Sequence, residues 1–245
     1  MSLFVIPMAG LSSRFFKAGF TVPKYMLPLD GQSMFEWSVS SFRQYFETDR
    51  FLFILRDVYD TPAFVRQQIE QMGILHYQLV ILTDETRGQA DTVWLGLQQS
   101  TYQDDLIIFN IDSRRHEYTK PVWLAECDGY LEVFKGEGDH WSFAQPINEH
   151  SMRVRRTTEK ERISDLCSDG LYHFKSRCLF DQAFEDAVKH NKLIRGELYI
   201  APLYNFLIEA DLDIRFDCIH PSQIDFCGTP SEYQILLHRQ QANEL

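Results

Sequence analysis

A run of small residues near the start of the sequence ends in an arginine, Arg14, and Lys24 follows. Small residues allow backbone N–H groups to approach phosphate oxygens closely, and an arginine fork pairs well with phosphate. The run therefore predicts a phosphate-binding turn, although an ordinary turn with a solvated arginine would have the same sequence. It matches neither a GxGxxG dinucleotide fingerprint nor a Walker loop. Its residues are Ala9, Gly10, Leu11, Ser12 and Ser13.

Two aspartates lie where a metal ion and a triphosphate would need them. Asp112 follows the apolar stretch at 105–111, and open α/β sheets bind ligands at the carboxyl ends of their strands. Asp225 precedes a Gly-Thr-Pro helix start, with Thr229 as its cap. Carboxylates and phosphates bind Mg²⁺ together, so we predict one Mg²⁺ on both aspartates. Taken singly, either aspartate could be a cap or a loop residue.

The composition excludes several classes of protein. The chain has 245 residues, which suits one large α/β domain or two small ones, and a formal charge of −11. That acidic balance argues against nucleic acid or an anionic membrane as the main partner. The five cysteines form no CxxC pair, which suits reduced thiols. There is no basic signal-peptide region and no apolar stretch of membrane-spanning length, so we expect a cytoplasmic location without membrane insertion.

Apolar stretches of strand length alternate with amphipathic stretches in the first half of the chain. The expected strands lie at 3–8, 51–55, 79–82 and 105–111, and the expected helices at 33–46, 61–72 and 89–99. This alternation predicts a parallel sheet with helices on both faces. Later the expected strands are shorter and mixed, at 130–134, 141–146, 152–157, 171–174 and 213–219, with helices at 178–190, 199–209 and from 231. We interpret the chain as one domain, with a nucleotide-binding half at about 1–115 and an acceptor-binding half at about 116–245.

The order of these stretches resembles that of a known family. From residue 3 to about residue 235 the sequence is similar to the sugar-phosphate nucleotidyltransferases, or nucleoside-diphosphate-sugar pyrophosphorylases. The matching segments are 9–14, 23–28, 31–37, 87–93, 110–112, 159–160, 170–172, 196–200 and 225–230. The resemblance implies a Rossmann-like three-layer α/β sandwich with a mixed, mostly parallel central sheet, the nucleotide-diphospho-sugar transferase fold.

The resemblance also implies how substrates are held. The small-residue turn would bind the phosphates of the nucleotide, and Gly88 and Gln89 would face its base. Lys160 would hold the acceptor phosphate, with Gly170 beside the acceptor and Glu197 on one of its hydroxyl groups. From the sequence alone, Glu197 could instead be an acid in the first turn of a helix, where the helix dipole favours it.

The sequence departs from the family pattern in three places. The family turn is usually Gly-Gly-x-Gly-Thr/Ser-Arg, whereas Ala9 and Ser12 replace two of its glycines here. Ser12 must therefore adopt whatever backbone angles the glycine adopts. The prolines that usually follow the two lysines are also replaced, after Lys24 and after Lys160.

Together these features predict an enzyme that transfers a nucleoside monophosphate from an NTP onto a sugar phosphate and releases pyrophosphate. Mg²⁺, Arg14 and Lys24 would offset the repulsion between two anions, and no general base is needed for an ionised acceptor. The product would be an NDP-sugar for polysaccharide or cell-surface glycan synthesis. Two alternatives are a cytidylyltransferase for a non-sugar phosphate such as phosphocholine, and a catalytically silent homologue. A glycosyltransferase of related fold would need a DxD motif, which 110–112 lacks.

Overall fold

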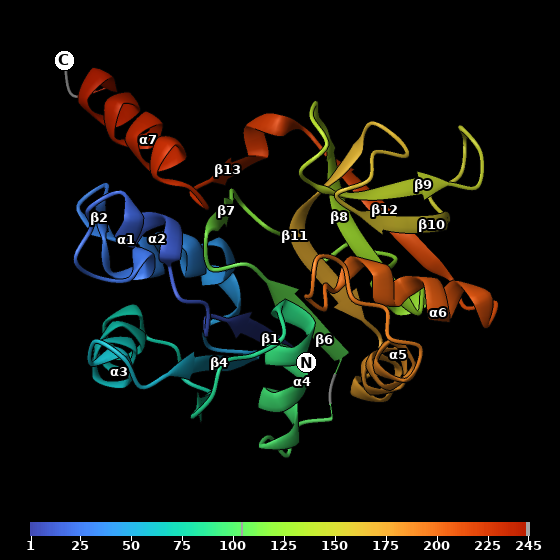
Figure 1. Cartoon of the computed structure of the whole chain (residues 1–245), viewed down its shortest axis with the longest axis horizontal. Helices are drawn as coiled ribbons and strands as arrows, with labels where there is room; N and C mark the ends of the chain where they lie inside the picture. The colour runs from blue at the N-terminus through green and yellow to red at the C-terminus, as the bar shows by residue number, and fades with distance from the viewer. Residues whose placement is uncertain (104, 244–245) are drawn as a thin grey trace.

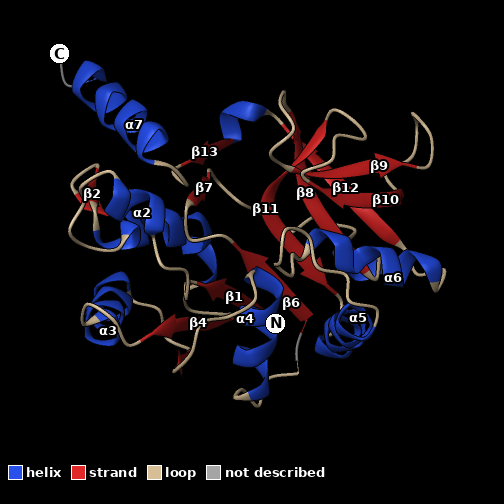
Figure 2. Cartoon of the chain, in the orientation of Figure 1, coloured by secondary structure: helices blue, strands red, loops and turns tan. Residues whose placement is uncertain are grey.

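A nine-stranded mixed sheet forms the centre of the molecule (Figures 1 and 2). The computed structural model describes residues 1–103 and 105–243, without the side chains of 240–243. Four parallel strands lie in the order β6, β1, β4, β5; they span Asp105–Phe109, Ser2–Pro7, Arg50–Arg56 and Tyr77–Leu82. The first strand of the chain thus lies inside the sheet, as in doubly wound α/β proteins.

Strands from the second half continue the same sheet. β11 pairs antiparallel with β6 and leads on to β9 and β10, while β8 also pairs with β11 and β12 pairs parallel with β8. These strands are β8 Gly129–Lys135, β9 Ser142–Pro146, β10 Val154–Glu159, β11 Leu166–Phe174 and β12 Ile214–Ile219. The mixed, mostly parallel sheet confirms the predicted architecture.

Helices α2 and α3 cover one face of the sheet, and α4, α5 and α6 cover the other, whereas α1 and α7 pack in a separate small cluster. The helices are α1 Ser13–Lys17, α2 Met34–Val39, α3 Thr61–Met72, α4 Gln89–Gln98, α5 Arg177–Lys189, α6 Tyr204–Glu209 and α7 Pro230–Asn243. Short 3₁₀ turns lie at Lys24–Met26, Ser40–Tyr45, Leu124–Glu126, Ala201–Leu203 and Pro221–Gln223. Two small ribbons complete the fold: β2 Pro28–Leu29 with β3 Gln32–Ser33, and β7 Ser113–Arg115 with β13 Ile224–Phe226.

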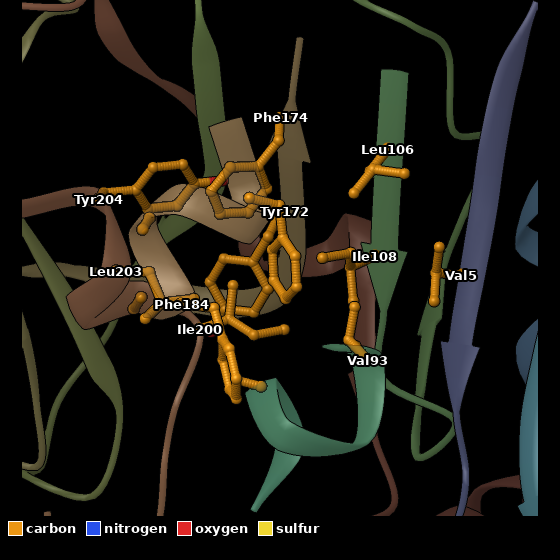
Figure 3. Packing of buried hydrophobic residues seen from close by; sticks show 14 of the residues in the cluster. Val5, Val93, Leu106, Ile108, Tyr172, Phe174, Phe184, Ile200, Leu203 and Tyr204 are labelled. Atoms are coloured by element: carbon orange, nitrogen blue, oxygen red, sulfur yellow. The ribbon is translucent and has the colours of Figure 1, made fainter. Parts of the chain in front are cut away.

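Strand alternation builds a core on each side of the sheet. In β1, Phe4 and Ile6 pack into the core beneath α2 and α3, whereas Leu3 and Val5 face the other side. Figure 3 shows this second core, where Val5 of β1 lies with Ile108 of β6 and with residues of α4, α5 and α6. Burial on both faces explains why these strands are continuous apolar runs.

Three predicted elements end earlier or break. The strand expected at 105–111 stops at Phe109, because 111–112 form a turn. The helix expected at 33–46 is α-helical only to Val39 and continues as a 3₁₀ turn that contains the non-helical Phe42. The helix expected at 199–209 likewise begins with a 3₁₀ turn around Pro202, since proline supplies no N–H for the helix ladder.

The structure bears on the expectations about cysteines and about membrane-spanning segments. All five cysteines are free thiols. Among residues 1–103 and 105–243 no helix has the length and apolar character needed to cross a bilayer.

Replacing Ile108 with alanine should test the buried core that β6 helps to form. Ile108 is fully buried, so Ile108→Ala should lower the free energy of unfolding by about 2–5 kcal/mol through lost contacts and an unfilled cavity. Urea denaturation of wild type and variant measures this difference. The matched control is Val188→Ala on α5, whose side chain is 40% exposed and whose loss should cost less than about 0.5 kcal/mol. Equal effects of the two changes would contradict the assigned core.

Candidate active site

The predicted residues from the first half meet at the carboxyl ends of β1 and β6. The small-residue turn follows β1, Asn110 and Asp112 follow β6, and Gln89 begins α4. Three cavities of about 220, 230 and 450 Å³ meet at this edge, and Gln89 lines all three. This is the position where open α/β sheets bind ligands.

An ion pair between Lys24 and Asp112 lies at the centre of the edge. Lys24 Nζ is 2.5 Å from Asp112 Oδ2, and both side chains are largely buried. Burial tends to raise the pKa of the Asp112 carboxyl, but the charges of Lys24 and Arg14 outweigh it and hold this pKa below its ordinary value. Asp112 is therefore an anion enclosed by cations, a local exception in an acidic protein.

Arg14 has a free guanidinium beside this pair. It lines the 230 Å³ cavity together with Asp112. Within the described part of the chain Arg14 forms no ion pair or hydrogen bond through its side chain. An uncommitted arginine at a ligand cavity is available to bind an anion.

The small-residue turn adopts a left-handed backbone conformation at Ser12, where the family usually has a glycine. Ser12 adopts the left-handed angles φ 52° and ψ 27°, so it takes the strained role expected of the missing glycine. Its hydroxyl also accepts a hydrogen bond from Lys24 N at 3.1 Å. The serine thus ties the lysine segment to the turn, a contribution that glycine could not make. A side chain built on Gly10 would meet only open space, so the backbone of the turn is accessible.

The base-side residues line the 450 Å³ cavity. Gly88 has φ 115°, and a Cβ there would lie 2.7 Å from Leu198 O, so only glycine fits. The side-chain amide of Gln89 donates to Asn110 Oδ1. The structure brings these residues together with most of the small-residue turn. The cavity is lined by Pro7, Ala9, Gly10, Leu11, Ser13, Arg56, Glu85, Thr86, Gly88, Gln89, Thr92 and Glu197.

Glu197 lies between the two larger cavities. It lines the 450 Å³ cavity, whereas the sequence predicted a contact with the acceptor. A hydrogen bond with Glu197 contributes, after burial, to raising the pKa of the Tyr199 hydroxyl, and Tyr199 lines the 230 Å³ cavity. The glutamate is exposed and does not begin a helix, because 201–203 form the next turn. Its predicted role on an acceptor hydroxyl stays a prediction.

The 230 Å³ cavity extends from Arg14 and Asp112 towards acidic and aromatic residues of the second half. It is lined there by His140, Trp141, Ser142, Glu159, Ser168, Asp169, Gly170, Tyr172, Tyr199, Phe226, Gly228, Thr229 and Glu232. Lys160 does not line this cavity. Its Nζ donates to the Tyr199 hydroxyl and lies 3.6 Å from Glu159 Oε1. Burial raises the pKa of Glu159 despite the nearby Lys160. Aromatic rings and acidic oxygens suit the C–H faces and hydroxyl groups of a sugar.

Gly170 is held at the floor of this cavity. Its φ is 96°, and a Cβ there would lie 2.3 Å from Asn110 Nδ2. The close approach of Gly170 to Asn110 connects the floor of the 230 Å³ cavity to the Asn110–Gln89 hydrogen bond.

Asp225 does not line the cavity that Asp112 lines. Phe226 of β13 lines that cavity with its strand partner Ser113, whereas Asp225 lines a separate cavity that Phe226 also reaches. Asp225 instead binds His116 Nε2 at 2.8 Å and Arg239 Nη1 at 3.2 Å. The shared metal ion predicted from the sequence therefore lacks one of its two ligands in this geometry.

Asp112 by itself fits a divalent metal. Gly228 leaves room beside it, since a Cβ there would lie 3.0 Å from Asp112 Oδ2. Mg²⁺ is commonly held by one or two carboxylates together with substrate phosphates. Residues 1–103 and 105–243 contain no cluster of three or more His, Cys, Asp or Glu side chains able to hold a metal. The phosphates of the substrate would have to supply the remaining ligands.

Sequence reasoning missed several residues of the site. Asn110 was visible beside Asp112, but its amide contact with Gln89 depends on the fold. Trp141 begins an expected strand and Tyr172 lies in β11, so both look like core residues in the sequence. Asp169 gave no signal at all, because an irregularity in strand pairing places it at the cavity.

Comparison with solved structures identifies proteins of the same architecture. The chain superposes on a nucleoside-diphosphate-sugar pyrophosphorylase from Vibrio cholerae RC9 with a TM-score of 0.93 and 50% sequence identity, over 96% of this chain and 99% of that chain. An inositol-1-phosphate CTP transferase from T. maritima gives a TM-score of 0.73 at 13% identity, over 96% and 94% of the two chains. A UDP-glucose pyrophosphorylase complexed with UDP-glucose gives 0.74 at 12% identity, over 99% of each chain. The last two likenesses show the fold alone.

No protein-family model and no curated protein sequence matches the chain.

Gly170→Ala should lower both the stability of the protein and its ligand binding more than Gly19→Ala does. The change combines a disfavoured backbone angle with a clash against Asn110, so we expect a loss of about 2–5 kcal/mol in unfolding free energy. Gly19→Ala is the matched control, since Gly19 has φ 93° but nothing within 4 Å of its Cβ. Denaturation and ligand titration should show a larger loss of stability and of ligand binding for Gly170→Ala. Equal losses would show that only backbone strain matters.

Stability should depend on pH through Asp112. Because its pKa is lowered in the folded protein, ionised Asp112 stabilises the fold near neutral pH, and this stabilisation is lost as pH falls through the folded-state pKa. The difference in unfolding free energy between wild type and Asp112→Asn should therefore be largest near neutral pH and shrink in acid. Urea denaturation across a pH series without divalent cations measures it, and a pH-independent difference would contradict the ion pair.

Proposed function

The chain belongs to the nucleoside-diphosphate-sugar pyrophosphorylase family, and we propose that its residues at the β1 and β6 edge carry out nucleotidyl transfer to a sugar phosphate. It is a nucleotidyltransferase by that membership. The observation that supports the assignment of roles is the meeting of Lys24, Asp112 and an uncommitted Arg14 at the junction of the cavities.

The reaction joins two anions. An oxygen of the acceptor phosphate forms a bond to the α-phosphorus of the NTP, the bond from that phosphorus to the bridging oxygen breaks, and pyrophosphate leaves with the electron pair. The acceptor oxygen is already ionised, so no proton has to be removed. The protein therefore has to hold the two reactants in line and to balance negative charge.

The two larger cavities suit the two reactants. We place the nucleotide in the 450 Å³ cavity, with its base near Gly88 and Gln89 and its phosphates on the small-residue turn. We place the acceptor in the 230 Å³ cavity, against Gly170 and the aromatic side chains that line it. The phosphates would then meet between Arg14 and Lys24, the cations nearest to Asp112.

Asp112 would hold the divalent cation, with Mg²⁺ the expected ion. Such an ion supplies positive charge to the phosphates when it is bound. Lys24 occupies the same carboxylate oxygen, so the lysine would leave Asp112 and reach the phosphates. Lys160 would support the acceptor side through Tyr199, with which its Nζ is hydrogen bonded.

The product would be an activated sugar, the kind of donor that polysaccharide and cell-surface glycan synthesis consumes. A 50% identity with a sugar-nucleotide enzyme favours a sugar phosphate over phosphocholine as the acceptor. A silent homologue would have no need to keep Arg14, Lys24 and Asp112 in one place.

The proposal is tested by combining purified protein with each NTP and a panel of sugar phosphates. Pyrophosphate and an NDP-sugar should appear in equal amounts, and excess EDTA should abolish both. Phosphocholine serves as the non-sugar acceptor. No transfer with any pair would overturn the proposal, and transfer confined to phosphocholine would replace the sugar with the alternative acceptor.

Arg14→Ala should slow transfer for every NTP that the enzyme accepts. Removing one donor to developing phosphate charge typically costs a factor of about 10²–10³ in turnover. The factor should be similar for all bases, because Arg14 lines the phosphate end of the cavities. Arg66→Ala, at an exposed arginine of α3, is the control and should leave turnover unchanged. Loss of discrimination between bases, in place of a uniform loss of rate, would show that Arg14 faces the base.

A further inference from the structure

Three buried ionisable residues lie beneath the acceptor cavity and take no part in the transfer described above. They are Arg115, Glu132 and Asp169, which are 5%, 1% and 2% exposed. They come from three elements, β7, β8 and β11, so their meeting is a property of the fold. Burying charged groups is costly unless they are paired, which calls for an explanation of this cluster.

Asp169 lies in an irregular part of β11. Ser168 pairs with Val133 and Tyr172 with Leu131, so three residues of β11 lie opposite the single residue Glu132. Side chains satisfy the backbone of this bulge: Ser168 Oγ accepts from Gly170 N at 3.2 Å, and Asp169 Oδ1 accepts from Leu171 N at 3.0 Å. Asp169 therefore holds the residue on the far side of Gly170.

The second oxygen of Asp169 lies near another carboxyl group. Asp169 Oδ2 is buried and has no donor among the described residues. Glu132 lies opposite 169–171 in the strand pairing, so the two buried carboxyls are neighbours, and a hydrogen bond between them lowers the pKa of Glu132 and raises that of Asp169. Glu132 Oε1 also accepts from Arg115 Nε at 2.6 Å. Two carboxyl groups form such a bond only when one of them carries a proton. One guanidinium, two carboxyls and one proton make the cluster neutral.

We propose that Asp169 is a positioning residue for the acceptor site, and that it sets Gly170 and Asn110 through a proton shared with Glu132. The inference rests on the proposed function, because Gly170 matters only as the floor of an acceptor site. Losing the proton would leave a net negative charge beneath a cavity that has to receive a phosphorylated acceptor. It would also turn an attraction between β8 and β11 into a repulsion at the bulge.

The surrounding groups favour retention of the proton. Burial, followed by the charge of Glu132, raises the pKa of Asp169 well above its ordinary value, and burial also raises the pKa of Glu132 against the pull of Arg115. Asp217 of β12 pairs with Glu132 across the sheet and adds negative charge. The other titratable groups facing the cluster are the Tyr118, Tyr130 and Tyr172 hydroxyls, and, across the cavity, Arg14, Asp112, His140, Glu159 and Glu232.

Single and double substitutions distinguish a proton shared by two carboxyls from an ordinary buried carboxylic acid. Asp169→Asn keeps an acceptor for Leu171 N and gives Glu132 a permanent donor, so it imitates the protonated state. Glu132→Gln fixes the donor on the other side and still leaves Asp169 to balance Arg115. Asp169→Asn combined with Glu132→Gln removes both carboxyls of the cluster from Arg115, so its effect should exceed the sum of the two single effects. Asp211→Asn, at an exposed aspartate beyond α6, is the control.

The first measurement is stability from about pH 5 to about pH 9, which needs no enzyme activity. A raised folded-state pKa gives stability that is present in acid and is lost as pH rises through that pKa. Wild type and Asp211→Asn should lose stability together over this range. Asp169→Asn and Glu132→Gln should each remove the part of the loss that belongs to the pair. Identical pH curves for wild type and both single variants would overturn the shared proton.

The second measurement is the Michaelis constant for each substrate across the same pH range. In wild type the KM for the acceptor should rise with pH by about tenfold, the effect of one lost buried hydrogen bond, while the KM for the NTP stays level. Asp169→Asn should flatten that rise. Equal changes in both KM values would reduce Asp169 to a general structural residue. If wild type transfers the nucleotidyl group but the two KM values respond to pH alike, only this inference is refuted. If wild type shows no transfer, the proposed function is refuted and the stability result still stands.

Discussion

The ion pair between Lys24 and Asp112 is the interaction on which the site depends. It joins the segment after the small-residue turn to the end of β6, two parts of the chain separated by 88 positions. Ser12 reinforces the connection by accepting the Lys24 backbone N–H. The pair keeps a carboxylate ionised in a buried place and keeps a lysine aimed at the position where phosphates would lie. Without it, Lys24 would lose its counter-ion and Asp112 would keep only the charge of Arg14.

The rest of the fold supplies rigid elements around that pair. The fully buried strands β1 and β6 end at the same edge, so the turn and the Asn110–Asp112 segment emerge side by side. Tight packing holds Gly88 against Leu198 and Gly170 against Asn110. An enzyme that joins two anions gains most from fixed positions and fixed charges, and this architecture provides both.

The sequence predicted most of the elements, because burial on both faces makes the strands continuous apolar runs and caps mark the helix starts. It also indicated Arg14, Lys24 and Asp112 from their positions after strands, whereas Gly88 and Gln89 came only from the family resemblance. It could not place Asp225, because a shift of one position along a strand turns a side chain to the opposite face. It could not find Asp169, whose place depends on a bulge between two strands distant in sequence. Long-range register, not local pattern, decides such positions.

In the proposed mechanism, Lys24 is the counter-ion of Asp112 in the free enzyme and a phosphate ligand during transfer. Manganese binding to Lys24→Gln, followed by electron paramagnetic resonance alongside turnover, tests this most directly. With its competitor removed, Asp112 should bind Mn²⁺ more tightly than in wild type, while turnover falls by a factor of about 10²–10³. Unchanged Mn²⁺ affinity together with unchanged turnover would contradict the central place given to this ion pair.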